Sequence, residues 1–543
     1  IQDAFKNKTV RIENWSLCTF NQRLLAGALD VPFIPTKSIG SSSMAQENKD
    51  SFCQILDPFG SRKQINLMKA LKPDIALIHG WAADPAGNTI VAPYITGGEY
   101  SHGAKASKNG VVVSVEQIVS TQFIRENSAM VKKDLKKRHE KEMIAWVDDL
   151  LKKDEEYRKS LQKSQALRAK RNKATLEINE IKKQGKDISA KIKEIKELPS
   201  KIKKIEEKQK ELKEKITYYL MRIPNILHES VPFGKDDTDN VVVKEVGKKK
   251  KFDFKLKSHG EMIEDLNGGD FSRAAKIAGT GFYYLKGKIA LLDLALQRYA
   301  IDLLVKRGYT LVEPPFLMNR KAYEGVTSLA DFENVMYKIE DEDLYLIATA
   351  EHPMGAMFMN EVLKESELPI KFCGVSACFR KEIGSHGIDT RGTFRVHQFS
   401  KIEQFIFCRP EESWKLHEEL QKNAEDLYKA LKIPYRVVNV CTGDIGIIAA
   451  KKYDLEAWSP RENKYFEVGS NSNCTAYQAA RLNIKYEKNN GEREFIHTLN
   501  NTAIATSRAL RAVLENYQNK DGSLTIPKVL IPYMNGIKKI GPE

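Results

Sequence analysis

The segment from residue 378 to residue 405, CFRKEIGSHGIDTRGTFRVHQFSKIEQF, constrains the fold more than any other part of the chain. Charges of both signs stand there among apolar and aromatic residues, and a buried charge is costly unless it meets a partner. If residues 393–407 form a strand, its side chains alternate between two faces. One face then carries Arg395, His397, Phe399, Lys401 and Glu403. The other is apolar, with Phe394, Val396, Ile402 and Ile406.

The stretch 374–382, GVSACFRKE, alternates in the same way and adds Arg380 and Glu382 to the charged face. We therefore predict an antiparallel hairpin with an apolar back. Its front suits an adenine nucleotide, because arginine pairs with phosphate and an aromatic ring stacks on a base. The carboxylate of Glu403 could receive an ammonium group. A salt-bridged surface sheet is the alternative, but the apolar flanks favour a largely buried sheet.

Residues 131–220 differ from the rest of the chain in composition. They hold 28 Lys and Arg against 17 Asp and Glu, and so carry most of the net charge of +15. Such an excess favours an anionic partner, for example a nucleic acid. Apolar residues recur there at heptad spacing, namely Ile188, Ile192, Ile195, Leu198, Ile202, Ile205, Leu212 and Ile216.

Gly185, in KKQGKD, is the one good helix terminator within this basic region. Leu161, Ile178 and Ile181 supply an apolar pattern before it. We therefore predict an antiparallel helical hairpin, with Pro199 ending or bending the second helix. A solvated single helix or a charged linker is the alternative.

Elements on both sides of the basic region can also be predicted. DIALIHG (74–80) and GVVVSVE (110–116) are typical of buried strands in a parallel α/β sheet. Further along, the spacing predicts a helix over 287–308 that ends at Gly308. The two prolines of YTLVEPPFL (309–317) predict an edge strand or an interface.

Cysteine usage and hydropathy exclude several classes of protein. Seven cysteines without a C-x-x-C pair indicate a reducing compartment and argue against a disulfide framework or a thiolate zinc site. No apolar run is long enough to span a bilayer. The first residues, IQDAFKNKTVRIENW, contain neither an initiator Met nor a signal-peptide core. We therefore expect a cytoplasmic protein whose numbering begins inside a longer product.

Several separated blocks resemble one family. FRKE followed by TRGTFRVHQFSKIEQF resembles motif 2 of the class II aminoacyl-tRNA synthetases, in the form found in seryl-tRNA synthetases. RGYTLVEPPFL resembles motif 1, LNNTAIATSRALRAVLENYQ resembles motif 3, and LIATAEHPMG and YFEVGSNSN also match. The blocks follow the family's order over residues 131–543, with wording that looks archaeal. The resemblance implies a multidomain α+β protein whose catalytic domain is an antiparallel β-sheet flanked by helices.

The family's reaction joins serine and ATP into seryl-adenylate, with Mg²⁺, and then transfers serine to tRNA(Ser). The resemblance implies catalytic roles for Arg380, Glu403, Glu467 and Arg508. It implies a serine site formed by Thr349, Glu351, Arg380, Glu403, Asn500 and Thr502. It implies an ATP site formed by Arg380, Glu382, Arg395, Phe399, Glu467, Ser470 and Arg508. Glu467 and Ser470 would hold magnesium through ATP, and no zinc is expected.

The resemblance also gives the basic hairpin a partner. In this family an antiparallel coiled coil grips the long variable arm of the serine tRNA. Contacts with phosphate groups do not depend on the base sequence. The implied tRNA-binding residues are Lys163, Arg168, Lys170, Arg171, Lys173, Lys182, Lys183 and Lys186. Pro315 is the proline of motif 1, which implies a homodimer interface.

Several other residues are not expected to take part in catalysis. Ala480 stands where many relatives have the first arginine of Q-A-R-R, which puts a local salt bridge in doubt. His397 is expected to be a hydrogen-bonded structural histidine, and Cys373, Cys378, Cys408, Cys441 and Cys474 are expected to be buried thiols.

The N-terminal region resembles a different family. ENWSLCTFNQRLLAGALDVPFIP and HGWAADPAGNTIVAPY resemble part of the α subunit of family I CoA-transferases, of the glutaconate type. We expect three regions: a partial CoA-transferase segment (1–128), a helical tRNA-binding arm (129–222) and a catalytic domain (223–543). The alternatives to a ligase are a non-catalytic tRNA-binding paralogue, and a CoA-transferase α-subunit fragment with a basic extension.

Overall fold

The computed structural model describes residues 22–23, 25–26, 30–36, 48–57, 64–71, 76–83, 89–90, 111–118, 122–183, 187, 196–328, 335–382 and 392–542. The chain forms two compact units. One comprises residues 1–122 with 158–173, and the other comprises residues 123–157 with 174–543.

The first unit contains two small sheets. β1 (Phe33–Thr36), β3 (Gln64–Lys69) and β2 (Phe52–Leu56) form an antiparallel sheet in that order. β4 (Ala76–Ala83) pairs in parallel with β6 (Val111–Ile118), and β5 (Thr89–Ile90) joins β4 on its other side. The predicted parallel pairing of the two N-terminal hydrophobic runs is thus confirmed.

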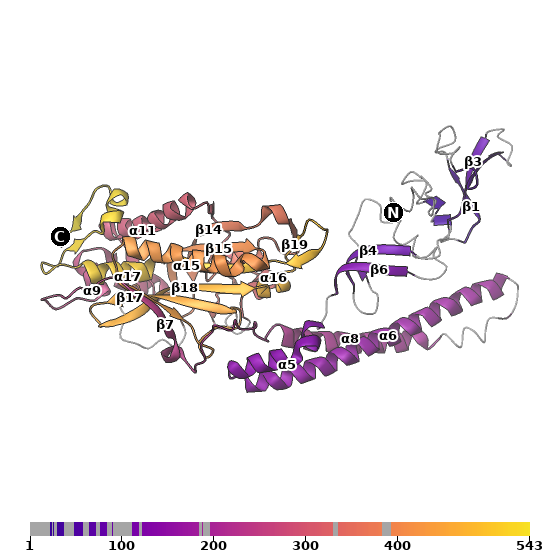
Figure 1. The fold of residues 1–543 in the computed structure, drawn as a ribbon, viewed down its shortest axis with the longest axis horizontal. Helices are drawn as coiled ribbons and strands as arrows, with labels where there is room; N and C mark the ends of the chain where they lie inside the picture. The colour runs from indigo at the N-terminus through magenta and orange to yellow at the C-terminus, as the bar shows by residue number, and fades with distance from the viewer. Residues whose placement is uncertain are drawn as a thin grey trace. The chain divides into compact units, whose positions relative to one another are not determined.

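The described residues of the basic region and of the segment just before it form the helices α5 (Gln122–Lys137), α6 (Lys141–Lys183) and α8 (Leu198–Leu220). α8 lies beside the first part of α6 (Figure 1), where Tyr219 donates a 2.6 Å hydrogen bond to Asp149 and Lys208 lies 3.6 Å from Glu156. Partners that advance along α6 recede along α8, so the two helices are antiparallel. The predicted helical hairpin is confirmed in this part.

The predicted seam is buried on α8, at Leu198, Ile202, Leu212 and Ile216. Pro199 lies in the first turn of α8, after a turn at residues 196–197, and its effect on a preceding helix stays a prediction because residues 188–195 lie outside the described residues. A proline is tolerated there, since the first amide groups of a helix have no intrahelical acceptor. Gly185, Ile188, Ile192 and Ile195 lie outside the described residues.

Buried polar contacts fix the base of the helices to the following segment and to the large sheet domain. Arg138 donates to the carbonyl oxygen of Asn225 at 2.7 Å and to that of Gly446 at 3.2 Å. The Asp134 carboxylate accepts from the backbone N–H of Leu227 at 3.1 Å. These bonds join segments that are far apart in sequence.

An eight-stranded sheet forms the centre of the large domain, in the order β10-β14-β15-β21-β18-β17-β16-β7. The strands are β10 (Thr310–Val312), β14 (Ile370–Phe379), β15 (Gln398–Cys408), β21 (His497–Ala505), β18 (Lys464–Thr475), β17 (Lys451–Ser459), β16 (Tyr435–Asn439) and β7 (Val241–Val246). All pairs are antiparallel except β10 with β14. The predicted edge strand is confirmed, because β10 forms one edge and ends before its prolines.

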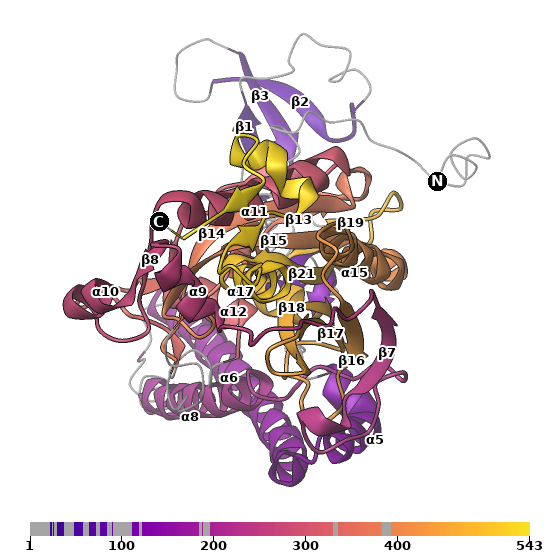
Figure 2. The same ribbon diagram turned by 90° about the vertical axis from the view of Figure 1, so that its left-hand side faces the viewer.

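Helices cover both faces of this sheet (Figure 2). α11 (Gly287–Lys306), α15 (Ser413–Ala430) and α17 (Thr506–Tyr517) share one apolar core with Ile402 and Ile406 of β15. α12 (Arg320–Val326), α14 (Glu351–Ala356) and α16 (Tyr477–Leu482) contribute to a second core with Phe405 and Phe407. Alternate residues of one strand thus enter opposite cores, as the pleat requires.

The remaining elements are short and lie around the sheet. They are η1 (Asp237–Asp239), α9 (His259–Asp265), β8 (Gly269–Asp270), α10 (Phe271–Ala278), β9 (Tyr284–Leu285), β11 (Leu317–Met318), β12 (Tyr345–Leu346), β13 (Val362–Lys364), η2 (Glu365–Glu367), η3 (Pro410–Glu412), β19 (Lys485–Glu487), β20 (Arg493–Phe495), β22 (Leu524–Thr525), η4 (Lys528–Met534) and β23 (Lys539–Ile540). The helix predicted over 287–308 is confirmed as α11, and Gly308 follows it with φ of +85°.

The predicted hairpin is confirmed as β14 and β15, but the second strand starts later than expected. It begins at Gln398, and residues 392–395 form bends. Gly392 has φ of +135°, and the N–H of His397 donates to the carbonyl oxygen of Gly281 at 2.9 Å instead of to β14. A tertiary contact thus takes the place of the ladder bond that would extend the strand.

Candidate active site

One face of the large sheet gathers most of the predicted site residues. Register places Lys401 opposite Ser376, and Glu403 between Gly374 on β14 and Thr502 on β21. The pairing between β15 and β21 shifts between Ile402 and Glu403, so Ala503 is the extra residue of a β-bulge. Because of this bulge, Thr502 lies on the same face as Glu403.

Lys401 and Glu403 form a buried ion pair on this face. Their side chains are only 6% and 1% exposed, and Nζ lies 2.6 Å from the Glu403 carboxylate. Thr502 Oγ1 donates to the same oxygen at 3.3 Å. Burial raises the pKa of Glu403, although Lys401 and Thr502 act in the opposite direction. The pair therefore keeps the Glu403 carboxylate buried, and this carboxylate could receive a cationic group of a ligand.

A second carboxylate lies nearby, at the start of α14. Glu351 Oε1 accepts hydrogen bonds from Asn500 Nδ2 at 3.0 Å and from Gln478 Nε2 at 3.1 Å. Its backbone N–H donates to Thr349 Oγ1 at 3.2 Å. Burial, followed by repulsion from Glu403, raises the pKa of Glu351 to about 7. Thr349, Glu351, Glu403, Asn500 and Thr502 thus belong to one polar group.

Gly374 allows α14 to approach the sheet closely. A Cβ at this position would lie 2.6 Å from Met354 Cε and 2.9 Å from Ala350 Cβ. Any larger residue would push the helix away from β14, and Glu351 would move with it. The glycine therefore brings the two carboxylates of the site together.

Arg380 follows directly after β14, and its guanidinium group lies over the Phe399 ring at 5.3 Å from the centroid. Its Nε donates to the carbonyl oxygen of Ala348 at 3.3 Å. The N–H of Ala348 donates to Tyr323 Oη at 3.0 Å, and His352 Nδ1 lies 2.9 Å from the same hydroxyl group. The buried tyrosine thus fixes the peptide that holds Arg380.

At the other end of the face, Arg508 pairs with Glu467. Arg508 Nη1 lies 3.0 Å from the carboxylate of Glu467 and 3.1 Å from its backbone oxygen. Burial acts against the charged form of Glu467, but Arg508 and Lys452 outweigh it and lower its pKa to about 2. Across the sheet, burial raises the pKa of Asp454 to about 7. The carboxylate of Glu467 is therefore ionised at neutral pH.

A second bulge places Ser470 beside Glu467. Residues three apart in a regular strand point to opposite faces, but the pairing of β17 with β18 shifts so that Val468 is extra. Glu467 and Ser470 consequently lie on one face. A carboxylate that stays ionised and a hydroxyl group are hard oxygen ligands of the kind that Mg²⁺ accepts, so the residues present fit this ion.

The structure does not bring every predicted residue to this face. Arg395 is exposed and precedes β15, so its predicted place on the charged strand face was wrong. His397 Nδ1 lies 2.6 Å from Tyr337 Oη and its ring stacks on Phe282, so it is hydrogen-bonded as expected. Glu382 is half-buried beyond the end of β14.

The remaining predicted residues belong to other elements of the chain. Lys163, Arg168, Lys170, Arg171 and Lys173 are exposed on α6. Lys182 and Lys183 belong to the end of α6, whereas Lys186 lies outside the described residues. Pro315 is exposed after β10, and Ala480 is exposed on α16. The five cysteines expected to be buried are buried.

Sequence reasoning missed three contributors to the site. Gln478 binds Glu351, Lys401 neutralises Glu403, and Tyr323 supports Ala348. The alternation of β15 already placed Lys401 on the charged face, so it could have been included. No sequence signal was available for Tyr323 or Gln478, which reach the site from α12 and α16.

The described residues contain no group of three or more His, Cys, Asp or Glu side chains arranged to hold a metal ion. Among the same residues, no helix is both long and apolar enough to cross a membrane.

Three family models match the chain. The class II core domain of the G, H, P, S and T tRNA synthetases matches residues 336–517, and the N-terminal domain of seryl-tRNA synthetases matches residues 118–227. The coenzyme A transferase model matches residues 1–134. The resemblances to the two families inferred from the sequence motifs are thus confirmed.

Similar proteins agree with these models. A serine–tRNA ligase of Methanocella arvoryzae is 58% identical over 423 residues, which cover 78% of this chain and 100% of the relative. A solved seryl-tRNA synthetase of Pyrococcus horikoshii, complexed with ATP, has a TM-score of 0.73 at 49% identity and covers 78% of this chain and 100% of that one. A Naegleria fowleri enzyme with AMP has a TM-score of 0.68 at 37% identity and covers 77% and 96%. The chain therefore belongs to the seryl-tRNA synthetase family of class II aminoacyl-tRNA synthetases.

Proposed function

We infer that this chain is a serine–tRNA ligase, an ATP-dependent enzyme that activates serine and transfers it to tRNA. One observation carries the inference for this chain in particular. A single sheet face holds the buried Lys401–Glu403 pair at one end and the Arg508–Glu467 pair at the other, with Arg380 beside Phe399. This arrangement suits a small zwitterion and a flat polyanion bound side by side.

The first reaction joins two anions. The serine carboxylate attacks the α-phosphorus of ATP, an O–P bond forms, and the bond to pyrophosphate breaks. The protein must reduce the repulsion and align the two reactants, which is mainly an electrostatic and positioning task. We assign Arg380 to bridge the carboxylate and the α-phosphate, Phe399 to stack on adenine, and Glu382 to contact its edge. Arg508 holds the phosphate tail, and Arg395 is assigned only to the outer part of the nucleotide site, because it is exposed.

The serine site follows from the second carboxylate group. Glu403 and Thr349 receive the ammonium group, while Glu351, Asn500 and Thr502 surround the side-chain hydroxyl. A site built to hydrogen-bond a hydroxyl rejects alanine, because the buried polar groups lose their partner. Threonine is excluded by its extra methyl group. The hydrogen bonds from Asn500 to Glu351 and from Thr502 to Glu403 support this assignment.

Magnesium would be held through ATP by Glu467 and Ser470, and it would supply positive charge at the phosphates. The low pKa of Glu467 keeps that carboxylate charged over the whole physiological range. Arg508 also pairs with this carboxylate, so it keeps Glu467 oriented before a nucleotide arrives.

We assign residues 129–222 to tRNA binding, residues 223–543 to catalysis, and residues 1–128 to the coenzyme A transferase-like segment. Exposed lysines and arginines on α6 support contacts with the phosphates of the long variable arm of tRNA(Ser). A homodimer is proposed through motif 1, because Leu311, Phe316 and Leu317 are exposed apolar residues next to Pro315.

Serine-dependent exchange of pyrophosphate into ATP tests the activation step. We expect exchange with serine and roughly a hundredfold less with alanine or threonine. Charging of tRNA(Ser) transcripts with and without the variable arm tests the second step. Because serine must be activated before it is transferred, a folded sample that binds tRNA but shows neither exchange nor charging would identify a non-catalytic paralogue.

A further inference from the structure

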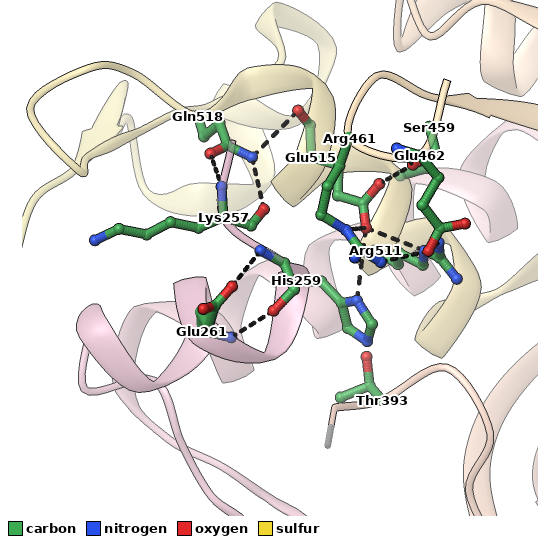
Figure 3. A network of polar contacts seen from close by, with 12 residues as sticks. Lys257, His259, Glu261, Thr393, Ser459, Arg461, Glu462, Arg511, Glu515 and Gln518 are labelled. Atoms are coloured by element: carbon green, nitrogen blue, oxygen red, sulfur yellow. Dashed lines mark hydrogen bonds and ion pairs between the residues drawn. The ribbon is translucent and has the colours of Figure 1, made fainter. Parts of the chain in front are cut away.

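Arg511 lies one turn after Arg508 on α17, in a buried polar cluster that none of the proposed substrate contacts uses (Figure 3). Its Nε donates to Glu515 Oε1 at 3.1 Å, and Nη2 lies 2.7 Å from Glu462. Ser459 and Arg461 also donate to Glu515. Burying this many charges contributes little to stability compared with apolar packing, so another role for them should be sought.

Two aromatic rings enclose the Arg511 guanidinium group. Its centre lies 4.3 Å from the ring centroid of Phe394 and 4.3 Å from that of Phe466. The rings meet edge to face, 5.6 Å apart at 84°. Phe466 directly precedes Glu467, and the Arg508 guanidinium group lies over the Phe394 ring, 5.6 Å from its centroid. Arg511 therefore touches the neighbours of both phosphate-side residues.

The same cluster holds the backbone next to Phe394. A Cβ on Gly392 would lie 2.2 Å from His259 Nε2, and the His259 ring is fully buried with Nδ1 3.7 Å from Glu515. Thr393 Oγ1 donates to the carbonyl oxygen of Ser507 at 3.3 Å. Residues 392–394 are thus packed between α9 and α17, within motif 2.

We propose that Arg511 is a positioning residue for ATP. It clamps Phe394 and Phe466 together and thereby keeps Arg508 and Glu467 in the orientation that the phosphate groups require. Glu515 and Glu462 hold the guanidinium group against the two rings through their contacts with Nε and Nη2. The planar guanidinium group can stack on the rings and pair with both carboxylates at the same time. The proposal rests on the assignment of Arg508 and Glu467 to the nucleotide.

The test compares Arg511→Met, Arg511→Lys and Phe394→Leu in serine-dependent exchange, with KM measured separately for ATP and for serine. Misplacing a positioning group by a fraction of an ångström reduces the effective alignment, so KM for ATP should rise roughly tenfold or more in Arg511→Met. KM for serine should change less than about twofold. Arg511→Lys keeps the charge over the rings and should recover part of the loss.

Arg461→Met is the matched control, because Arg461 belongs to the same cluster through Glu515, whereas it is the Arg511 guanidinium group that lies over Phe394 and Phe466. It should lower the melting temperature without raising KM for ATP. Equal changes in both KM values, or the same ATP effect in Arg461→Met, would overturn the proposal. If Arg511→Met does not fold, Phe394→Leu tests the same contact between the ring and the guanidinium group. Arg508→Ala is measured in parallel: if it leaves KM for ATP unchanged, the ATP assignment itself fails, independently of Arg511.

Discussion

The large sheet and the helical arm both depend on charged residues, but they use them in opposite ways. Lys401 and Glu403 are almost completely buried and lie 2.6 Å apart, whereas Lys163 and Lys173 are exposed on α6. A buried pair depends on each partner, because removing one leaves an uncompensated charge. The effect of exposed charges on nucleic-acid binding depends on how many of them contact phosphate groups, and salt screens it.

This difference predicts how each region should respond to mutation. In the sheet, one substitution should abolish a step of the reaction. In the arm, single substitutions should have small effects that add up, and their size should depend on ionic strength. The four predictions below test the contrast, in order of decreasing effect.

Glu403→Ala should cause the largest loss. It removes the proposed ammonium ligand and leaves Lys401 buried without its 2.6 Å partner, so exchange should fall roughly a hundredfold or more. Glu419→Ala is a matched control, because Glu419 pairs with Lys371 at 2.7 Å in a more exposed place. It should change exchange less than about twofold. Equal losses in both variants would contradict the contrast between buried and exposed pairs.

Arg508→Ala should raise KM for ATP roughly tenfold, since it removes a charge-assisted contact to phosphate. Glu467→Gln should have a similar effect, because the two side chains pair at 3.0 Å. The double variant should be clearly less impaired than the product of the single effects, as expected for residues in direct contact. Strict multiplication of the effects would indicate that the two residues act independently.

Glu351→Gln should change the pH dependence of stability. The pKa of Glu351 is raised to about 7 from its usual 4.5, so the native state binds a proton more tightly than the unfolded state. The resulting stability is complete below about pH 4.5 and is lost as the pH rises through about 7. Urea unfolding from pH 4.5 to 8 should show this decline in the parent chain, by about 1–2 kcal/mol, and a smaller decline in Glu351→Gln. An unchanged slope in Glu351→Gln would show that the pKa of Glu351 is not raised in the native state.

Lys163→Ala and Lys173→Ala should have the smallest individual effects. Each should lower tRNA affinity by about two- to threefold and reduce the dependence of log K on log salt by about 1 if it contacts one phosphate. Combined, the losses should multiply. Lys288→Ala, an exposed lysine of α11, is the control and should leave both values unchanged. A loss of a hundredfold from one arm lysine would break the comparison.

Local patterns predicted much of the fold. The alternation around Lys401 and Glu403 predicted a hairpin with an apolar back, and β14 and β15 form it. The hydrophobic runs before residue 131 predicted parallel pairing, and the heptad spacing predicted the buried side of α8. These features depend on periodicity, which the backbone geometry of each element fixes locally.

The errors have physical reasons in contacts that are distant in sequence. The strand with Glu403 begins at Gln398 because His397 bonds to Gly281. Pro199 lies in the first turn of α8, a position that fits a residue without an N–H group. Neither the start of this strand nor the start of this helix is specified by the adjacent residues in the sequence alone.

The amino-acid sequence by itself determined the family, the reaction and the charged strand face, because motifs and alternation are properties of short segments. Only the tertiary structure decided which side chains meet. Two β-bulges place Thr502 beside Glu403 and Ser470 beside Glu467, and Gly374 admits α14 so that Glu351 lies near Glu403. These juxtapositions depend on register and close packing between strands and helices that are far apart in the chain, and no local pattern specifies them.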